Sequence, residues 1–171
     1  MASGQAVLRN AVCCGDATSV QALLQAGVST KITADAGGGG LCDTYLHDAA
    51  NNGCKEVVQL LLDAGEDVNE ADKQGMTALH FATRGGFFGA ASALIAAGAE
   101  VDIAEPECGN TPLHFAAKAG ALSLVRLLLS EGAELKKTNR DRDDAEALWR
   151  GSRADFNSLL ANLYTAMHGA Q

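Results

Sequence analysis

One pattern recurs along this chain at nearly constant spacing, and it constrains the fold more than any other feature of the sequence. Gly15, Gly53, Gly86 and Gly120 are each followed by an apolar residue at the fifth position, by two more at the eighth and ninth, and by a second glycine at the twelfth. Successive copies begin 38, 33 and 34 residues apart. A period of this length predicts a row of similar structural units, each packed against its neighbours.

The copy that starts at Gly109 indicates that each unit is a pair of short helices. Thr111 can cap a helix start, and Pro112 suits the first helical position because no intrahelical N–H is lost there. Gly120 can adopt positive φ and end this helix, and Gly132 ends a second helix that carries an apolar stripe. Helices this short are not stable alone in water. Each unit therefore needs neighbours.

Upstream of three of the marker glycines stands the motif Thr-x-Leu-His, at 44–47, 77–80 and 111–114. A period of about 33 residues with Thr-Pro-Leu-His-x-Ala is the signature of the ankyrin repeat. The sequence resembles the ankyrin-repeat family over nearly its whole length. The resemblance implies an all-α solenoid of stacked helix-turn-helix units with protruding, hairpin-like finger loops.

We expect a single ankyrin-repeat domain over residues 1–171. The four recognisable repeats are expected at about 5–30, 43–68, 75–101 and 109–135, followed by a degenerate cap at 141–167. Within the cap, helices are expected near 144–150 and 154–167, with Trp149 packed back onto the fourth repeat.

Three places depart from the repeat pattern. Arg9 stands where later repeats carry histidine, which fits a first repeat with one face in water. In the third repeat, Phe88 occupies a half-buried position of the family pattern and Phe87 a more exposed one. The segment 30–42 is longer than the other connections and contains four consecutive glycines. It is either an adaptable lip that orders around a partner or a tolerated loop insertion.

Composition narrows the function classes. A formal net charge of −8 argues against nucleic acid as a direct partner, because phosphate binding draws on clustered Lys and Arg. No run approaches the roughly 18 apolar residues of a membrane span, so no membrane contact is expected. The five cysteines form no CxxC pair, and we interpret them as reduced thiols of an intracellular protein, in the cytoplasm or the nucleus. The free chain is expected to be a monomer.

No candidate catalytic or metal site emerges. His47, His80 and His114 occupy equivalent places in successive repeats, and packed helices lie about 8–10 Å apart. Zinc ligands must lie within about 4 Å of one another, given metal–nitrogen distances near 2.0–2.1 Å. The resemblance implies instead that these histidines tie adjacent loops by hydrogen bonds. Because no nucleophile elbow, phosphate loop or His-Glu-x-x-His helix is present, we expect no enzyme activity and no cofactor.

The resemblance implies a protein–protein interaction module, acting as an adaptor or inhibitor. In this family partners usually meet the concave surface formed by the first helices of the repeats, here called the palm, together with the finger loops. Carried over position by position, the candidate partner-binding residues are Tyr45, Asp48, Asn51, Asn52, Met76, Phe81, Arg84, Phe115 and Lys118. Phe81 and Phe115 with Arg84 resemble a binding hot spot, where aromatic and Arg anchors dominate. The alternative is that both rings are partly buried between repeats.

The charge pattern suggests a kind of partner. Acidic residues outnumber basic ones between Asp63 and Cys108. Such fingers favour a partner with a basic surface, or they merely keep the array soluble.

The segment from Leu61 to Asn69 supports an alternative function. It is similar to the Leu-x5-Asp-Val-Asn pattern that asparaginyl hydroxylases modify in ankyrin repeats, with Asn69 as the modification candidate. Otherwise Asn69 is a turn-forming residue whose side chain bonds the neighbouring backbone. The alternative function is that of a modification substrate, or of a non-catalytic regulatory subunit of an enzyme complex.

Overall fold

The computed structural model of the chain describes residues 4–30 and 44–168. Within these ranges the secondary structure consists of helices, with one isolated antiparallel bridge between Ala71 and Thr77. The helices are α1 (Gly4–Cys14), α2 (Ala17–Gln25), α3 (Tyr45–Asn51), α4 (Lys55–Asp63), α5 (Ala78–Arg84), α6 (Phe88–Ala96), α7 (Pro112–Lys118), α8 (Leu122–Ser130) and α9 (Arg153–His168). The predicted all-α solenoid is confirmed.

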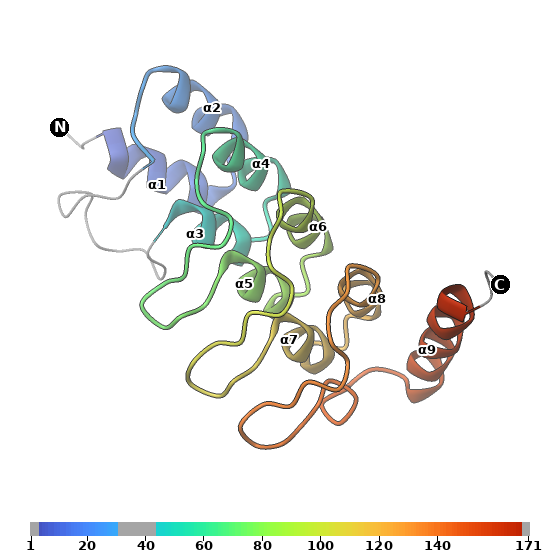
Figure 1. Cartoon of the computed structure of the whole chain (residues 1–171). Coiled ribbons are helices and arrows are strands. Elements are labelled where there is room, and N and C mark those ends of the chain that lie inside the picture. Colours follow the sequence, from blue (N-terminus) through green and yellow to red (C-terminus); the bar gives the residue numbers. More distant parts are fainter. Residues whose placement is uncertain (1–3, 31–43, 169–171) are drawn as a thin grey trace.

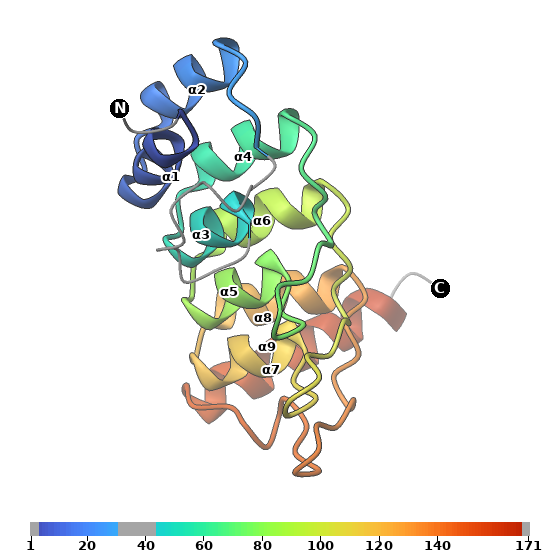
Figure 2. The ribbon, with the colours of Figure 1, turned by 90° about the vertical axis from the view of Figure 1, so that its left-hand side faces the viewer.

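The first eight helices pack as consecutive pairs that stack into two layers (Figure 1). Helices α1, α3, α5 and α7 form the inner layer, whose exposed side is the palm, and α2, α4, α6 and α8 form the outer layer. The loops between α4 and α5 (residues 66–76), between α6 and α7 (99–110) and after α8 (133–143) project in the same direction (Figures 1 and 2). We call these loops the second, third and fourth fingers. The glycine-rich segment lies outside the described residues.

Small side chains allow the inner helices to pack closely. Ala49, Ala50, Ala82, Ala116 and Ala117 are fully buried between successive helices of this layer. Leucines and valines from both layers complete one apolar core that runs the length of the array. Because each pair buries its apolar face only against its neighbours, stability depends on the stacking of repeats.

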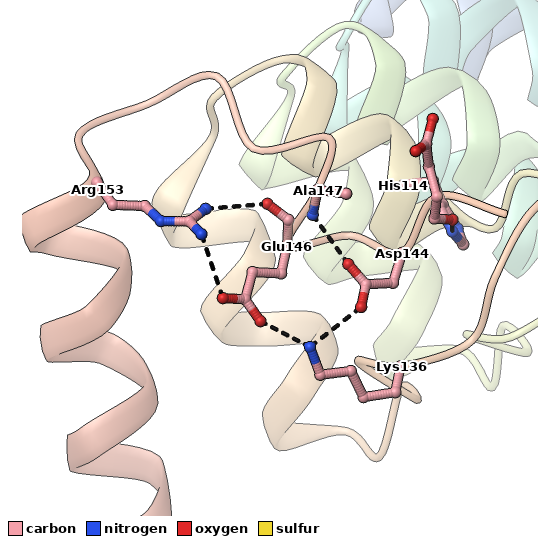
Figure 3. A network of polar contacts seen from close by, with 7 residues as sticks. His114, Lys136, Asp144, Glu146, Ala147 and Arg153 are labelled. Carbon is pink, nitrogen blue, oxygen red and sulfur yellow. Dashed lines mark hydrogen bonds and ion pairs between the residues drawn. The ribbon is translucent and has the colours of Figure 1, made fainter. Parts of the chain in front are cut away.

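The C-terminal cap differs from the sequence-based expectation. Residues 144–150 form turns rather than a helix. A small network of charged side chains holds this segment: Lys136 Nζ lies 3.1 Å from Asp144 and 2.7 Å from Glu146, and Arg153 lies 3.4 Å from Glu146 (Figure 3). The Asp144 carboxylate also accepts the Ala147 N–H at 2.9 Å. These polar contacts hold the segment in turns, and its apolar side chains pack against the core from this conformation.

Trp149 contacts α9, the single regular helix of the cap. Its ring stacks on Phe156 with centroids 4.9 Å apart, and its Nε1–H donates to the Ser152 carbonyl at 3.0 Å. The cap also meets the fourth repeat, because α9 packs against α8 and the Arg150 N–H donates to the Ala117 carbonyl at 3.1 Å. The cap is thus one helix joined to the array by turns.

The expected burial of the two neighbouring phenylalanines was wrong. Phe88 is 47% exposed on the outer layer, whereas Phe87 is half-buried. Phe87 precedes α6 and points back to the second repeat, where a Cβ added to Gly53 would lie 2.4 Å from its ring. At the start of α6, the residue before the helix therefore packs across the repeat boundary, and the first helical residue faces water.

Candidate functional site

The histidines form a ladder between the inner helices and the fingers. The Nε2 atoms of His47, His80 and His114 lie 3.0, 3.0 and 3.1 Å from the carbonyl oxygens of Met76, Ile103 and Asp143. Each histidine thus ties its own repeat to the next finger, the role that the family resemblance implies. Among the described residues, no group of three or more His, Cys, Asp or Glu side chains is arranged to hold a metal ion.

His80 shows why these imidazoles are structural groups. The backbone N–H of Thr77 donates to Nδ1 at 3.0 Å, so the ring proton resides on Nε2 and is donated to Ile103. Burial lowers the pKa of His80 to about 4. Burial likewise lowers the pKa of His114. The two rings are neutral at physiological pH and are occupied on both nitrogens.

His47 and His80 also pack against the residue that follows the histidine of the next repeat. His47 faces Phe81 with ring centroids 5.6 Å apart, and His80 faces Phe115 at 5.9 Å. Both pairs are edge-to-face, a favourable aromatic geometry. The residue after each histidine is therefore part of the repeat interface.

The first interface uses a charged pair at the same place. Arg9 Nε lies 3.9 Å from the Asp48 carboxylate, and its guanidinium lies 5.4 Å from the centre of the Tyr45 ring. Arg9 is only 9% exposed, so its expected position on a face in water was wrong. The inner side of the first repeat instead contacts the second through a buried polar pair.

The structure buries four of the nine candidate binding residues. The four are Tyr45, Asp48, Met76 and Phe81, with 0%, 4%, 6% and 5% exposure. Tyr45 donates its hydroxyl to the Gln5 carbonyl at 3.1 Å, and Met76 accepts from His47 through its carbonyl. Phe81 therefore offers no exposed ring to a partner, because its own neighbours cover it.

Arg84 covers Phe81 on the palm side. Its guanidinium carbon lies 4.7 Å from the ring centre. Nη2 donates to Asn51 Oδ1 at 3.4 Å, and Nη1 lies 3.9 Å from Met76 Sδ. These contacts come from three successive parts of the chain, α3, the second finger and α5, so the guanidinium is positioned by the stacking itself.

Five of the candidate residues reach the surface. They are Asn51, Asn52, Arg84, Phe115 and Lys118, with Asn52 and Arg84 the more exposed. Asn52 donates to the Cys13 carbonyl at 3.4 Å. Along the described palm, the solvent-accessible charges of α1, α3, α5 and α7 are Arg84 and Lys118, since Arg9 and Asp48 are buried. The palm is thus locally cationic in an acidic protein.

Part of the acidity of the fingers has a structural role that sequence reasoning missed. Asp72 accepts the N–H groups of Gln74 and Met76 at 2.9 and 2.8 Å. Glu105, in the longer third finger, accepts the N–H groups of Glu107, Cys108 and Asn110 at 2.7 to 2.9 Å. Asn139 accepts two more in the fourth finger. The recurrence of such an acceptor in each described finger was a signal in the sequence.

Glu105 illustrates how a carboxylate replaces the hydrogen bonds that a finger lacks. The residue is 5% exposed, and desolvation alone would make ionisation harder. The N–H groups of Asn110, Cys108 and Glu107 outweigh this effect and hold the pKa of Glu105 below its ordinary value. The extra methylene of Glu relative to Asp matches the extra residue of this finger.

Asn69 bonds the backbone of the next finger. Its Oδ1 accepts the Glu100 N–H at 2.8 Å, and its Nδ2 donates to the Gly98 carbonyl at 3.4 Å. The side chain therefore links the second and third fingers at their bases.

Comparison with known proteins agrees with this architecture. A family model described as ankyrin repeats (3 copies) matches residues 8–105, 46–141 and 88–166. The chain belongs to the ankyrin-repeat family. It is also similar to mouse protein phosphatase 1 regulatory subunit 27, with 39% identity over 62 residues, which are 36% of this chain and 40% of that protein. In the described ranges, no helix is long and apolar enough to cross a membrane.

Proposed function

We propose that this chain is an adaptor or inhibitor that binds a partner protein through the palm and the adjoining sides of the fingers. The observation that carries the proposal is Arg84, an exposed guanidinium fixed by Phe81, Asn51 and Met76. Arg is among the residues that dominate binding energy at interfaces. Because these contacts already order the Arg84 side chain, docking of a partner there costs less side-chain entropy.

The mechanism is presentation by a rigid surface. Histidine bonds join every described finger to the inner layer, so palm and fingers move as one body. A partner held across several repeats is occluded from other proteins, or is brought beside whatever else the array binds. Neither role requires a catalytic group.

The fingers refine the proposal. Glu70 and Glu107 are exposed on the second and third fingers and take no part in holding the loops through their carboxylates. A partner with basic groups facing these two carboxylates fits the outer rim. In water such rim contacts affect association rate more than affinity.

A role as a non-catalytic regulatory subunit is the second candidate. The observation that favours it is the similarity to a mouse protein named as a regulatory subunit of protein phosphatase 1. In this role the same palm would hold an enzyme or its substrate within a complex. Modification of Asn69 is a further possibility for this chain, and it requires the amide to leave Glu100 and Gly98 first.

Affinity capture with matched variants tests the proposal. Asn52→Trp places a bulky uncharged side chain on the palm, and Gln21→Trp places the same side chain on the exposed outer layer. Partners captured from a native lysate by the wild-type chain should be retained by Gln21→Trp and lost by Asn52→Trp, with equal helicity in circular dichroism. Equal capture by both variants would remove the palm from the proposal.

A further inference from the structure

The distribution of charge over the inner layer sets the palm apart from the rest of the molecule. The chain carries a formal net charge of −8, yet the two accessible charges on α1, α3, α5 and α7 are both positive. Arg84 and Lys118 stand at equivalent positions, each four residues after the histidine of its repeat. Helices α5 and α7 pack side by side, so the two cations lie next to each other along the palm.

The geometry of Arg84 leaves its guanidinium prepared for an anion. One face rests on Phe81 at 4.7 Å, and two N–H groups contact Asn51 and Met76 at 3.4 and 3.9 Å. A guanidinium has five N–H donors in a planar fork that matches a carboxylate. The two contacts are long for hydrogen bonds, so a carboxylate replaces or adds to them at little cost.

A purely structural account explains less of the arrangement. Both cations lie in the last turn of their helices, where a positive charge interacts favourably with the helix dipole. A cation near the carbonyl end satisfies that role without any ordered contact. It does not require Arg84 to be held over a buried ring by residues of the preceding repeat.

We propose that the palm binds an extended acidic segment of the partner, with one carboxylate on Arg84 and a second on Lys118. This inference rests on the proposed function and names the chemistry of the partner. Equivalent positions on neighbouring helices are about 8–10 Å apart. In a polyproline II segment, residues three apart lie on the same side and about 9 Å apart. The partner therefore carries Asp or Glu at positions i and i+3.

The fingers restrict how such a segment is placed. Exposed carboxylates at Glu70 and Glu107 repel a uniformly acidic peptide from the rim. The segment that fits has its two acidic side chains over the palm and neutral or basic residues toward the fingers. Attraction on the palm and repulsion on the rim together fix its register.

Selection from a random-peptide phage library against the full chain tests the inference. Enriched peptides should carry two acidic residues three positions apart. Labelled synthetic copies should bind at least about tenfold more weakly to Arg84→Glu and to Lys118→Glu, as expected for loss of a charge-assisted contact. Arg126→Glu is the matched control, because Arg126 is an exposed cation on the outer helix α8. It should leave the affinity unchanged.

Charge exchange distinguishes a direct contact from a general effect of net charge. A peptide with Lys at both acidic positions should regain affinity for the Arg84→Glu/Lys118→Glu double variant. Enriched peptides that lack the acidic pair, but still compete with the partners that Asn52→Trp loses, would overturn the inference and leave the palm as the binding surface. Equal loss in Arg126→Glu would also overturn it.

Discussion

Arg9 and Asp48 face each other at the first repeat interface in the positions that His80 and Phe115 occupy at the third. The charged atoms lie 3.9 Å apart, and both side chains are buried. The aromatic pair meets edge to face at 5.9 Å. One geometric slot of the array thus holds an ion pair at the first interface and an aromatic pair at the later ones.

Substitution of either charged partner should weaken the first interface. Arg9→Ala or Asp48→Ala leaves the other charge buried with its ion-pair partner missing, which should lower the free energy of unfolding by roughly 2–4 kcal/mol. The double variant Arg9→His/Asp48→Phe installs the pair found at the other interfaces and should recover part of this loss. Urea unfolding of the two alanine variants, of Arg9→His and Asp48→Phe alone, and of their double variant measures the coupling. If the loss of stability in Arg9→His/Asp48→Phe equals the sum of the losses in the two single variants, the two positions do not act as a pair.

The features that the sequence predicted correctly are those encoded by local spacing. Helix pairs follow from the caps, glycines and apolar stripes of each unit, and the histidine ladder is what the family resemblance of the recurring motif implies. The burial of Phe81 depends on Arg84 and on contacts from the preceding repeat. The spacing of residues in the sequence does not indicate these contacts. Arg9 was misplaced for the same kind of reason, since its partner lies in the next repeat.

The cap and the palm show the same limit. The apolar positions of 154–167 correctly indicated a helix, whereas Asp144 and Glu146 bind Lys136 and Arg153 and the segment between the fourth finger and α9 forms turns. The palm was identified by resemblance, but its accessible part depends on which side chains the neighbours cover. Arg84 and Lys118 remain accessible at equivalent positions because they are long and polar.

Close packing across a repeat boundary predicts different effects at two glycines with similar backbone. Gly53 and Gly65 have φ of 71° and 89°, so alanine should cost about 1–2 kcal/mol at both positions. A Cβ at Gly53 would lie 2.4 Å from the Phe87 ring, whereas Gly65 has nothing within 4 Å. Gly53→Ala should therefore lower the melting temperature clearly more than Gly65→Ala. The difference in melting temperature between Gly53→Ala and Gly65→Ala should become smaller when Phe87 is also replaced by alanine. If this difference does not change, the contact between Gly53 and the Phe87 ring is contradicted.

The Glu105 carboxylate should make the third finger sensitive to acid. Its pKa is lowered in the folded state, so its contribution is present above the unfolded value of about 4.3 and is lost as pH falls through the folded pKa. Glu105→Gln should lower the free energy of unfolding at pH 7 by about 1–3 kcal/mol, because an amide cannot accept all of these N–H bonds. The exposed Glu107→Gln is the control and should stay close to wild type. The difference in free energy of unfolding between Glu105→Gln and wild type should become smaller near pH 3. A difference that stays constant with pH would argue against an ionised acceptor.

Glu66 should have the opposite dependence on pH. Its Oε2 accepts the Leu46 N–H at 3.0 Å, while Oε1 is buried without a hydrogen-bond partner among the described residues. Burial raises the pKa of Glu66 to about 7, with Glu70 and Asp48 adding like charge.

A carboxyl that binds its proton more tightly when folded stabilises the fold less as pH rises from about 4.5 to 7. Glu66→Gln removes the buried charge and should raise the free energy of unfolding at pH 8 by about 1–2 kcal/mol. At pH 5 the wild-type group is already protonated, so the two chains should unfold at similar urea concentrations. The exposed neighbour supplies the matched control, because Glu70→Gln should change stability little at either pH. If Glu66→Gln is no more stable than wild type at pH 8, the carboxylate has a partner or solvent access that removes the penalty.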